Sequence, residues 1–264
     1  IIQGNKLRKL KYNLLNTLEN KKNCIATFGG AWSNHIVATA KAASLSHLQS
    51  IGFIRGDELS EKPQLWSKTL IQAKQFGMEL IFLNRVEYRL KQTSNVVKNA
   101  ILQRNIEVVF IPEGGSNALA LLGVAEIITE LQNQMNPPTH IVTACGTGGT
   151  MAGLIEGIKQ AQWHTKIIGI PVLKNGLFLE KDIQQLLSEN NQVEWQLYDN
   201  YDFGGYAKTT HELRQFGVDF VEKTQIDLDK IYTSKAFYAT FDLIDKGLIP
   251  EKSRVVILHT GGLQ

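Results

Sequence analysis

The sequence predicts an α/β protein built from two twisted, mostly parallel sheets with helices on both faces. Short runs of β-branched residues alternate with longer helical patterns, and this alternation is typical of parallel strands joined by crossover helices. Five strand runs are almost entirely apolar, as expected of strands that are covered on both faces. These runs read IATF, IGFI, VVFI, IVTA and VVIL.

The composition supports a globular chain with a buried core. Of its 264 residues, 43% are hydrophobic and 20% are charged, which excludes disorder, collagen and coiled coil. A net charge of +3 is too small to indicate nucleic acid or an anionic membrane as the main partner. No apolar run approaches the roughly 20 residues of a membrane span, and no signal peptide opens the chain. We therefore expect a cytoplasmic protein.

Strands and helices are expected in regular alternation. The strands are expected at Cys24–Phe28, Ser50–Ile54, Glu79–Leu83, Glu107–Ile111, His140–Ala144, Lys166–Val172 and Arg254–His259. The helices are expected at Arg8–Glu19, Asn34–Leu45, Lys62–Phe76, Ser94–Arg104, Asn117–Asn133, Thr150–Ala161, Leu177–Ser188 and Ser234–Asp245. Ligands of open parallel sheets bind where strands lead into helices, so the loops at those points are the candidate sites.

The expected strand–helix units are more than one short doubly wound sheet needs. A second series of strands and helices begins after Gly114-Gly115. We expect a small α/β domain over residues 9–115 and a larger domain made of residues 1–8 and 116–264. Because the chain begins with Ile1 and stops abruptly at Gln264, both ends are expected to be incomplete.

Cysteine and histidine give no sign of a disulfide framework or a metal site. Cys24 and Cys145 form no CxxC motif, and the six histidines have no ligand spacing. We expect no metal.

The clearest single motif is the loop after the His140–Ala144 strand, which runs directly into a helix and reads Gly146-Thr147-Gly148-Gly149-Thr150. Glycines let backbone N–H groups close around an anion, and the helix N-terminus and threonine hydroxyls add further attraction. No Gly-Lys-[Ser/Thr] follows, so this is not a P-loop, and Met151 departs from a dinucleotide fingerprint. The loop predicts a phosphate site; the alternative is a glycine-rich turn without a ligand.

A second candidate is Lys6, in a basic stretch that by itself is typical of a solvated helix face. Lys6 precedes Leu10 by one helical turn and Leu14 by two, so it shares their apolar side. Burial and the helix dipole lower the pKa of such a lysine. A lowered pKa is what a Schiff-base lysine needs, since only the neutral amine attacks a carbonyl.

Two more loops contain polar residues after glycines. Ser33 or Asn34 caps the helix that follows Gly29-Gly30, and a cap can also direct a side chain into a cleft. Gly114-Gly115-Ser116-Asn117-Ala118 nearly matches a nucleophile elbow, but its last position is Ala, so a glycine turn capped by Ser116 or Asn117 is favoured.

Taken together, these motifs resemble those of the tryptophan-synthase-β-like (fold type II) pyridoxal-phosphate enzymes. More narrowly, the chain resembles the D-cysteine desulfhydrase/1-aminocyclopropane-1-carboxylate deaminase group. The ordered matches, from Gly4 to Gly262, are Gly4-Asn5-Lys6-x-Arg8-Lys9-Leu10, Gly29-Gly30-x-x-Ser33-Asn34, Pro112-x-Gly114-Gly115-Ser116-Asn117-Ala118-Leu119, Gly146-Thr147-Gly148-Gly149-Thr150, Tyr232-Thr233-x-Lys235-Ala236 and His259-Thr260-Gly261-Gly262.

The resemblance implies pyridoxal 5′-phosphate as cofactor, a homodimer, and a role for each matched residue. Lys6 resembles the Schiff-base lysine, and the Gly146–Thr150 loop (Gly146, Thr147, Gly148, Gly149, Thr150) resembles the phosphate cup. Asn34 matches the residue that bonds the cofactor's 3′-oxygen. Ser33 matches the hydroxyl that faces the substrate, with Asn34 and His35 beside the substrate carboxylate.

Further matches concern the ring and the reaction. Tyr206 and Tyr232 resemble the pair of active-site tyrosines, and Thr233 falls where a side chain meets the pyridine nitrogen. The cyclopropane deaminases typically have Glu and Leu where this chain has Thr233 and Thr260, as desulfhydrases do. A neutral hydroxyl at the pyridine nitrogen suits elimination of a good leaving group better than cleavage of a ring carbon–carbon bond.

The resemblance therefore implies β-elimination from a small amino acid, with D-cysteine converted to pyruvate, ammonia and sulfide. Lys6 would remove the α-proton. The alternative within the group is 1-aminocyclopropane-1-carboxylate deamination, with Ser33 or Tyr232 near the reacting carbon. A non-catalytic phosphate- or nucleotide-binding α/β protein is the alternative from another class.

Overall fold

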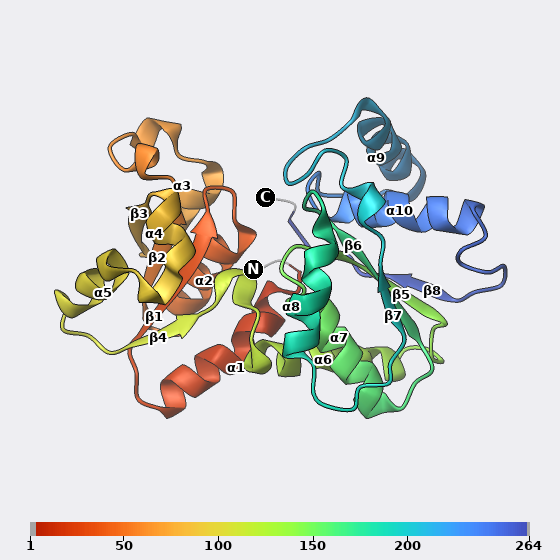
Figure 1. Ribbon diagram of the computed structural model, residues 1–264, viewed down its shortest axis with the longest axis horizontal. Coiled ribbons are helices and arrows are strands. Elements are labelled where there is room, and N and C mark those ends of the chain that lie inside the picture. Colours follow the sequence, from red (N-terminus) through yellow and green to blue (C-terminus); the bar gives the residue numbers. More distant parts are fainter. Residues whose placement is uncertain (1–3, 263–264) are drawn as a thin grey trace. The chain divides into compact units, whose positions relative to one another are not determined.

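The computed structural model describes residues 4–262, which form two compact units (Figure 1). Among these residues, unit 1 contains 6–120, and unit 2 contains 4–5 and 121–262. Each unit has one four-stranded parallel sheet with helices on both faces, which confirms the predicted fold class. No helix in the described part of the chain is long and apolar enough to cross a membrane.

Unit 1 contains a sheet with the strand order β3-β2-β1-β4. Its strands are β1 (Cys24–Gly30), β2 (Gln49–Arg55), β3 (Glu79–Leu83) and β4 (Val108–Ile111). Its helices are α1 (Lys6–Glu19), α2 (Asn34–Leu45), α3 (Lys68–Gln75), α4 (Arg85–Leu90) and α5 (Asn95–Leu102). Cys24 pairs with Gln49 on one side and Val108 on the other, so the three strands begin level with one another.

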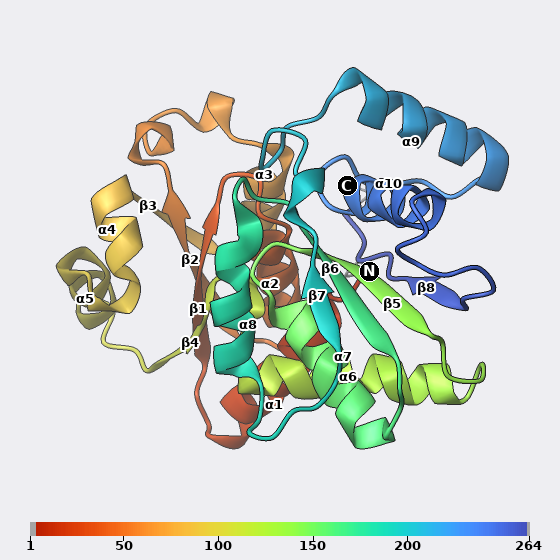
Figure 2. The ribbon, with the colours of Figure 1, turned by 45° about the vertical axis from the view of Figure 1, so that its right-hand side comes forward.

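Alternation along β1 divides the core of unit 1 into two layers. Cys24, Ala26 and Phe28 pack toward α4 and α5, whereas Ile25 packs toward α1 and α2. Figure 2 shows α4 and α5 on one side of this sheet and α2 and α3 on the other. Because every strand is covered on both faces, apolar residues occupy nearly all its positions.

Unit 2 contains a sheet with the strand order β7-β6-β5-β8. Its strands are β5 (His140–Cys145), β6 (Lys166–Pro171), β7 (Trp195–Leu197) and β8 (Val255–Ile257). Its helices are α6 (Ala118–Gln132, whose first turn belongs to unit 1), α7 (Gly149–Ala161), α8 (Leu179–Leu186), α9 (His211–Thr224) and α10 (Thr233–Asp245). Helices α6, α7 and α8 cover one face of the sheet, and α10 covers the other.

Most strand and helix positions agree with the sequence prediction, with informative exceptions. The helix predicted at Lys62–Phe76 begins only at Lys68, because the Ser67 side chain accepts a hydrogen bond from the Leu70 amide and caps the helix there. Helices α4 and α9 and strand β7 were not predicted. α9 fully buries only Leu213, while Phe216 and Phe220 on the same side of the helix pack against Phe241 and Phe237 of α10.

Helix α7 lies unusually close to α6. A Cβ added to Gly153 would lie 2.5 Å from Val124 Cβ, and one added to Gly157 would lie 2.7 Å from Ile128 Cγ1. Both glycines are on the same side of α7, one turn apart. Their missing side chains therefore allow the two helices to approach, which fixes the helix that begins at the phosphate loop.

We predict that Gly153→Ala lowers the free energy of unfolding by about 1–3 kcal/mol, because the new methyl group overpacks the contact with Val124. The matched control is Gly217→Ala in α9, where an added Cβ meets no described atom within 4 Å. This change should stabilise the protein by roughly 0.5–1 kcal/mol through helix propensity. Urea unfolding measures both, and equal effects of the two substitutions would contradict the close packing of α7 on α6.

Candidate active site

The predicted site residues occur in both units and are described one unit at a time. In unit 1, Lys6 is the first residue of α1 and is half-buried. Leu10, one turn further along, is fully buried, and Leu14 is nearly so. Lys6 is thus at the edge of the apolar side of α1, where the sequence placed it.

The loop after β1 carries Ser33, Asn34 and His35. Ser33 occupies the N-cap position of α2, but among the described contacts its side chain makes no capping hydrogen bond. Its hydroxyl lies at the end of β1, 2.9 Å from where a Cβ on Gly29 would be. Ser33 and Asn34 are both half-buried, so their side chains are not fully sequestered in the core.

The side chain of His35, in contrast, lies in the core and is only 2% exposed. Its Nε2 is 2.8 Å from Thr27 Oγ1, and that hydroxyl donates to the Ile111 carbonyl, so Nε2 carries the proton. Burial, followed by the nearby charges of Lys9 and Lys6, holds the pKa of His35 well below its usual value. The ring of His35 is therefore neutral and lies in the core of unit 1, against Thr27.

Sequence reasoning assigned no role to Lys9, which is 2% exposed and lies one turn after Lys6. Its Nζ donates to the Gly114 carbonyl at 2.5 Å and to Ser116 Oγ at 3.0 Å. Asn117 accepts from the Ala120 amide at 2.9 Å and so caps α6, as the sequence predicted for this glycine turn. Lys9 thus attaches the start of α1 to that turn.

In unit 2, the Gly146–Thr150 loop joins β5 to α7. Gly148 is the N-cap in a left-handed conformation with φ 71°, and a Cβ there would lie 2.6 Å from Ile183 Cγ1. A Cβ on Gly146 would lie 3.2 Å from the Tyr232 ring. Among the described residues no side chain caps α7, so its N-terminal dipole end is available to an anion.

The residues just before Lys6 are attached to this loop and to the C-terminal motif. Asn5, which is 3% exposed, donates from Nδ2 to Thr150 Oγ1 at 2.6 Å. A Cβ on Gly4 would lie 1.8 Å from the Thr260 carbonyl oxygen, so only glycine fits at this position, which also has φ 61°. Lys6 therefore directly follows a segment that is anchored beside the phosphate loop.

Tyr206 and Tyr232 lie together in unit 2, as the predicted tyrosine pair should. Their ring centroids are 6.1 Å apart in an edge-to-face arrangement, and their hydroxyls are 3.4 Å apart. Both side chains are half-buried. Since Tyr232 also borders Gly146, the tyrosine pair and the phosphate loop belong to the same part of unit 2.

The structure adds Asp229, which sequence reasoning missed. Its carboxylate accepts a hydrogen bond from the Thr233 hydroxyl at 2.7 Å and from the Thr233 amide at 2.8 Å. It also accepts from the amides of Ile231 and Tyr232. Thr233 is fully buried, so its hydroxyl proton is committed to Asp229. The signal was an acidic residue ahead of a helix start, which is typical of a capping residue.

The described residues contain no group of three or more His, Cys, Asp or Glu side chains that could hold a metal ion. What the site residues offer instead is an anion-binding loop beside a tyrosine pair, and a lysine that follows a segment anchored to that loop. The loop suits an anion such as a phosphate group, and a half-buried lysine suits a Schiff base with an aldehyde.

Comparison with known proteins agrees with this chemistry. A family model described as "Pyridoxal-phosphate dependent enzyme" matches residues 2–261. A Thermotoga maritima protein named "Putative 1-aminocyclopropane-1-carboxylate deaminase" is 30% identical over 98% of this chain and 84% of its own. A Klebsiella pneumoniae protein named "D-cysteine desulfhydrase" is 28% identical over 98% of this chain and 82% of its own.

Among solved structures, one described as an "ACC deaminase homologue" is 30% identical, with a TM-score of 0.83, and the match covers 98% of this chain and 80% of that one. Sequence, fold and site chemistry agree. The chain therefore belongs to the fold type II pyridoxal-phosphate-dependent enzymes, in the group of D-cysteine desulfhydrases and 1-aminocyclopropane-1-carboxylate deaminases, and its cofactor is pyridoxal 5′-phosphate.

Proposed function

We propose that this enzyme catalyses β-elimination from D-cysteine, with water consumed and pyruvate, ammonia and hydrogen sulfide formed. The observation that carries the choice of substrate is the buried Thr233, which has a neutral hydroxyl where the resemblance implies Glu in the cyclopropane deaminases. Thr260, in place of their Leu, supports the same choice. A neutral partner for the pyridine nitrogen suits the loss of a good leaving group such as a thiol.

The residues present fit the cofactor. The Gly146–Thr150 loop would hold the phosphate through its backbone N–H groups, because its glycines leave the main chain open and α7 begins there. Asn34 would bond the 3′-oxygen, Thr233 and Thr260 would lie along the ring, and Lys6 would hold the cofactor covalently. When bound, pyridoxal phosphate supplies an electron sink for the charge left on Cα when its proton departs.

The side chains of this enzyme then have separate tasks. Lys6 Nζ takes the proton from Cα of the substrate, acting as a general base. Ser33, Asn34 and the backbone amide of His35 bind the substrate carboxylate and fix the orientation of the Cα–H bond. Tyr206 and Tyr232, whose hydroxyls are 3.4 Å apart, face the substrate side chain and protonate the departing sulfur.

We predict that Lys6→Ala lowers turnover of D-cysteine by at least about a hundredfold, because it removes both the covalent anchor and the general base. Lys11→Ala, an exposed lysine of the same helix, serves as the control and should retain activity. The visible absorption band of the lysine-bound cofactor should be lost in Lys6→Ala alone. Turnover retained in a folded Lys6→Ala protein would contradict the assignment of Lys6. A wild-type protein with neither turnover nor a visible cofactor band would favour a non-catalytic binding protein.

We also predict that the purified enzyme with pyridoxal phosphate releases sulfide and pyruvate from D-cysteine. With 1-aminocyclopropane-1-carboxylate it should release little ammonia and an equally small amount of 2-oxobutanoate. Parallel assays of both substrates and of L-cysteine measure this preference. Ring-opening activity at a rate above that of sulfide release would overturn the proposed substrate and leave the family unchanged.

A further inference from the structure

Lys235, in α10, is one of the largest fully buried side chains of the protein, with an exposed fraction of 0%. Among the described residues no carboxylate lies within ion-pairing distance of its Nζ. Burying a charge is costly unless hydrogen bonds compensate it. The groups that Lys235 contacts therefore indicate what this lysine does.

Its hydrogen-bond partners are three backbone carbonyls. Nζ donates to the oxygens of Asp202 at 2.7 Å, Gly205 at 2.8 Å and Val172 at 3.4 Å. An ammonium group has three N–H donors and no acceptor, so all three donors are used. Val172 directly follows β6, whereas Asp202 and Gly205 delimit a loop of residues 202–205, which we call the 202–205 loop.

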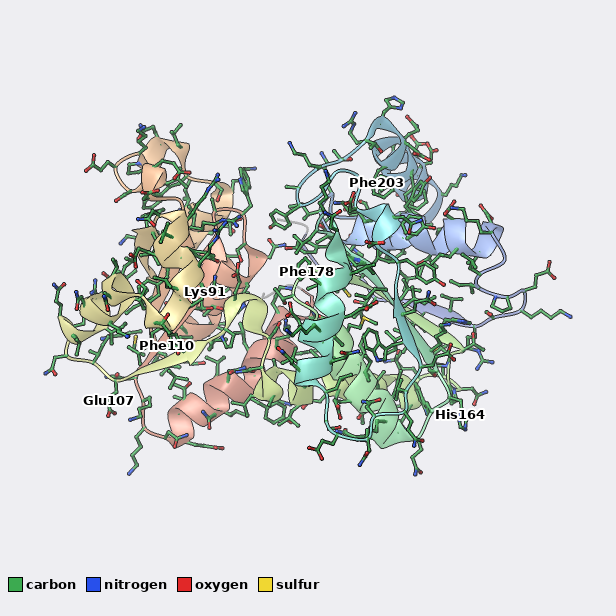
Figure 3. All side chains as sticks on the ribbon, in the orientation of Figure 1. Lys91, Glu107, Phe110, His164, Phe178 and Phe203 are labelled. Atoms are coloured by element: carbon green, nitrogen blue, oxygen red, sulfur yellow. The ribbon has the colours of Figure 1, made fainter. Side chains whose placement is uncertain are left out.

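The backbone of the 202–205 loop needs such support. Phe203 has φ 49°, Gly204 94° and Gly205 105°, and Ala207 just beyond has φ 57°. Left-handed conformations are unfavourable for Phe and Ala and persist only where contacts enforce them. Phe203, labelled in Figure 3, packs its ring edge-on against Tyr238 of α10 at 5.1 Å. Lys235 thus adds a polar attachment on the same helix.

Tyr206 directly follows Gly205, so the loop determines where its ring lies. Its partner Tyr232 comes three residues before Lys235, at the start of α10. Lys235 therefore links the segment that bears one tyrosine to the helix that bears the other.

We propose that Lys235 is a positioning residue, whose ammonium group holds the 202–205 loop on α10 and so fixes Tyr206 beside Tyr232. The proposal rests on the proposed function only where it assigns the tyrosine pair to the substrate. The hold on the loop is independent of the substrate.

The charge of Lys235 can be varied within the native protein. Burial lowers its pKa to about 8, and the negative charges of Asp202 and Asp229 oppose this shift. Above that pH the amine loses one of its three donors. Because the folded pKa lies below the usual 10.5, the unfolded chain binds more protons between pH 8 and 10.5. The contribution of Lys235 to the free energy of unfolding therefore rises with pH over this range. Over the same range its amine has one donor fewer for the carbonyls of the 202–205 loop.

Two phenols near the loop, Tyr238 and Tyr201, have a raised pKa. Hydrogen bonding to Glu212 raises the pKa of Tyr238 to about 12, and burial with a hydrogen bond to Asp242 raises that of Tyr201 further. Neither phenol loses its proton near pH 9. The side chains of Lys208 and Lys174 border Gly204 and Gly205 through their aliphatic parts.

Hydrogen–deuterium exchange of the holoenzyme tests the proposal directly. Lys235→Met keeps the length of the side chain but removes its donors. Lys223→Met, at an exposed lysine in the last turn of α9, is the matched control. We expect amides of residues 199–210 to exchange about tenfold faster or more in Lys235→Met, with β5 and α7 unchanged. The control should exchange like the wild type throughout.

Unchanged exchange of residues 199–210 in Lys235→Met would overturn the proposal. If that variant does not fold, the wild type is compared at pH 7 and pH 9.5, with exchange corrected for its intrinsic pH dependence. Faster exchange confined to residues 199–210 at pH 9.5 supports the proposal, and its absence overturns it.

Kinetics separates this proposal from the proposed function. If Tyr206 acts on the substrate, kcat for D-cysteine should fall at least about tenfold in Lys235→Met, while the visible band of the bound cofactor persists. A loosened loop with undiminished kcat would support the positioning role and contradict the function assigned to Tyr206.

Discussion

The candidate site depends on one constraint above all, which is the attachment of residues 4–5 to the loops of unit 2. Asn5 donates to Thr150 in the phosphate loop, and Gly4 lies against the Thr260–Gly261 peptide so closely that no side chain could be added. Lys6 is joined by a single peptide bond to Asn5, the last residue of this anchored segment. The hydrogen bond of Asn5 and the absence of a side chain at Gly4 thus fix the main chain that precedes Lys6.

The peptide against which Gly4 packs is itself held by a histidine. His259 Nε2 is 2.8 Å from the Asp227 carbonyl, which can only accept, so Nε2 carries the proton. The other ring nitrogen, Nδ1, is then the acceptor for the Gly261 amide at 3.2 Å. Only the neutral imidazole makes both hydrogen bonds. The position of the Thr260–Gly261 peptide therefore depends on one tautomer of one ring, and so does the packing of Gly4.

Much of this arrangement could be predicted because the glycine loops are short and local. Gly146–Thr150 specifies its own backbone shape, and α2 begins and ends where its sequence predicts. The sequence could not reveal the three acceptors of Lys235, because they are main-chain carbonyls of residues far away along the chain. Asp229 is only four residues before Thr233 and could have been recognised as a capping residue. His35 was assigned to the substrate from its neighbours, although helix geometry turns its side chain toward Thr27 and the core.

On the proposed function, with Thr233 at the pyridine nitrogen, the pairing of Thr233 with Asp229 would bear on how the enzyme distinguishes reactions. A Glu at this position would present a carboxylate directly, whereas Thr233 presents a hydroxyl whose proton is donated to the Asp229 carboxylate. The negative charge is thereby one hydrogen bond further away, and it is shared among the amides of residues 231–233. Interaction energy falls with distance and with each competing donor, so the stabilisation available to a protonated ring nitrogen is correspondingly weaker. On the proposed function, a site with weaker electron withdrawal would favour substrates whose own leaving group takes the electrons away. The thiol of cysteine is such a group, whereas a ring carbon is not.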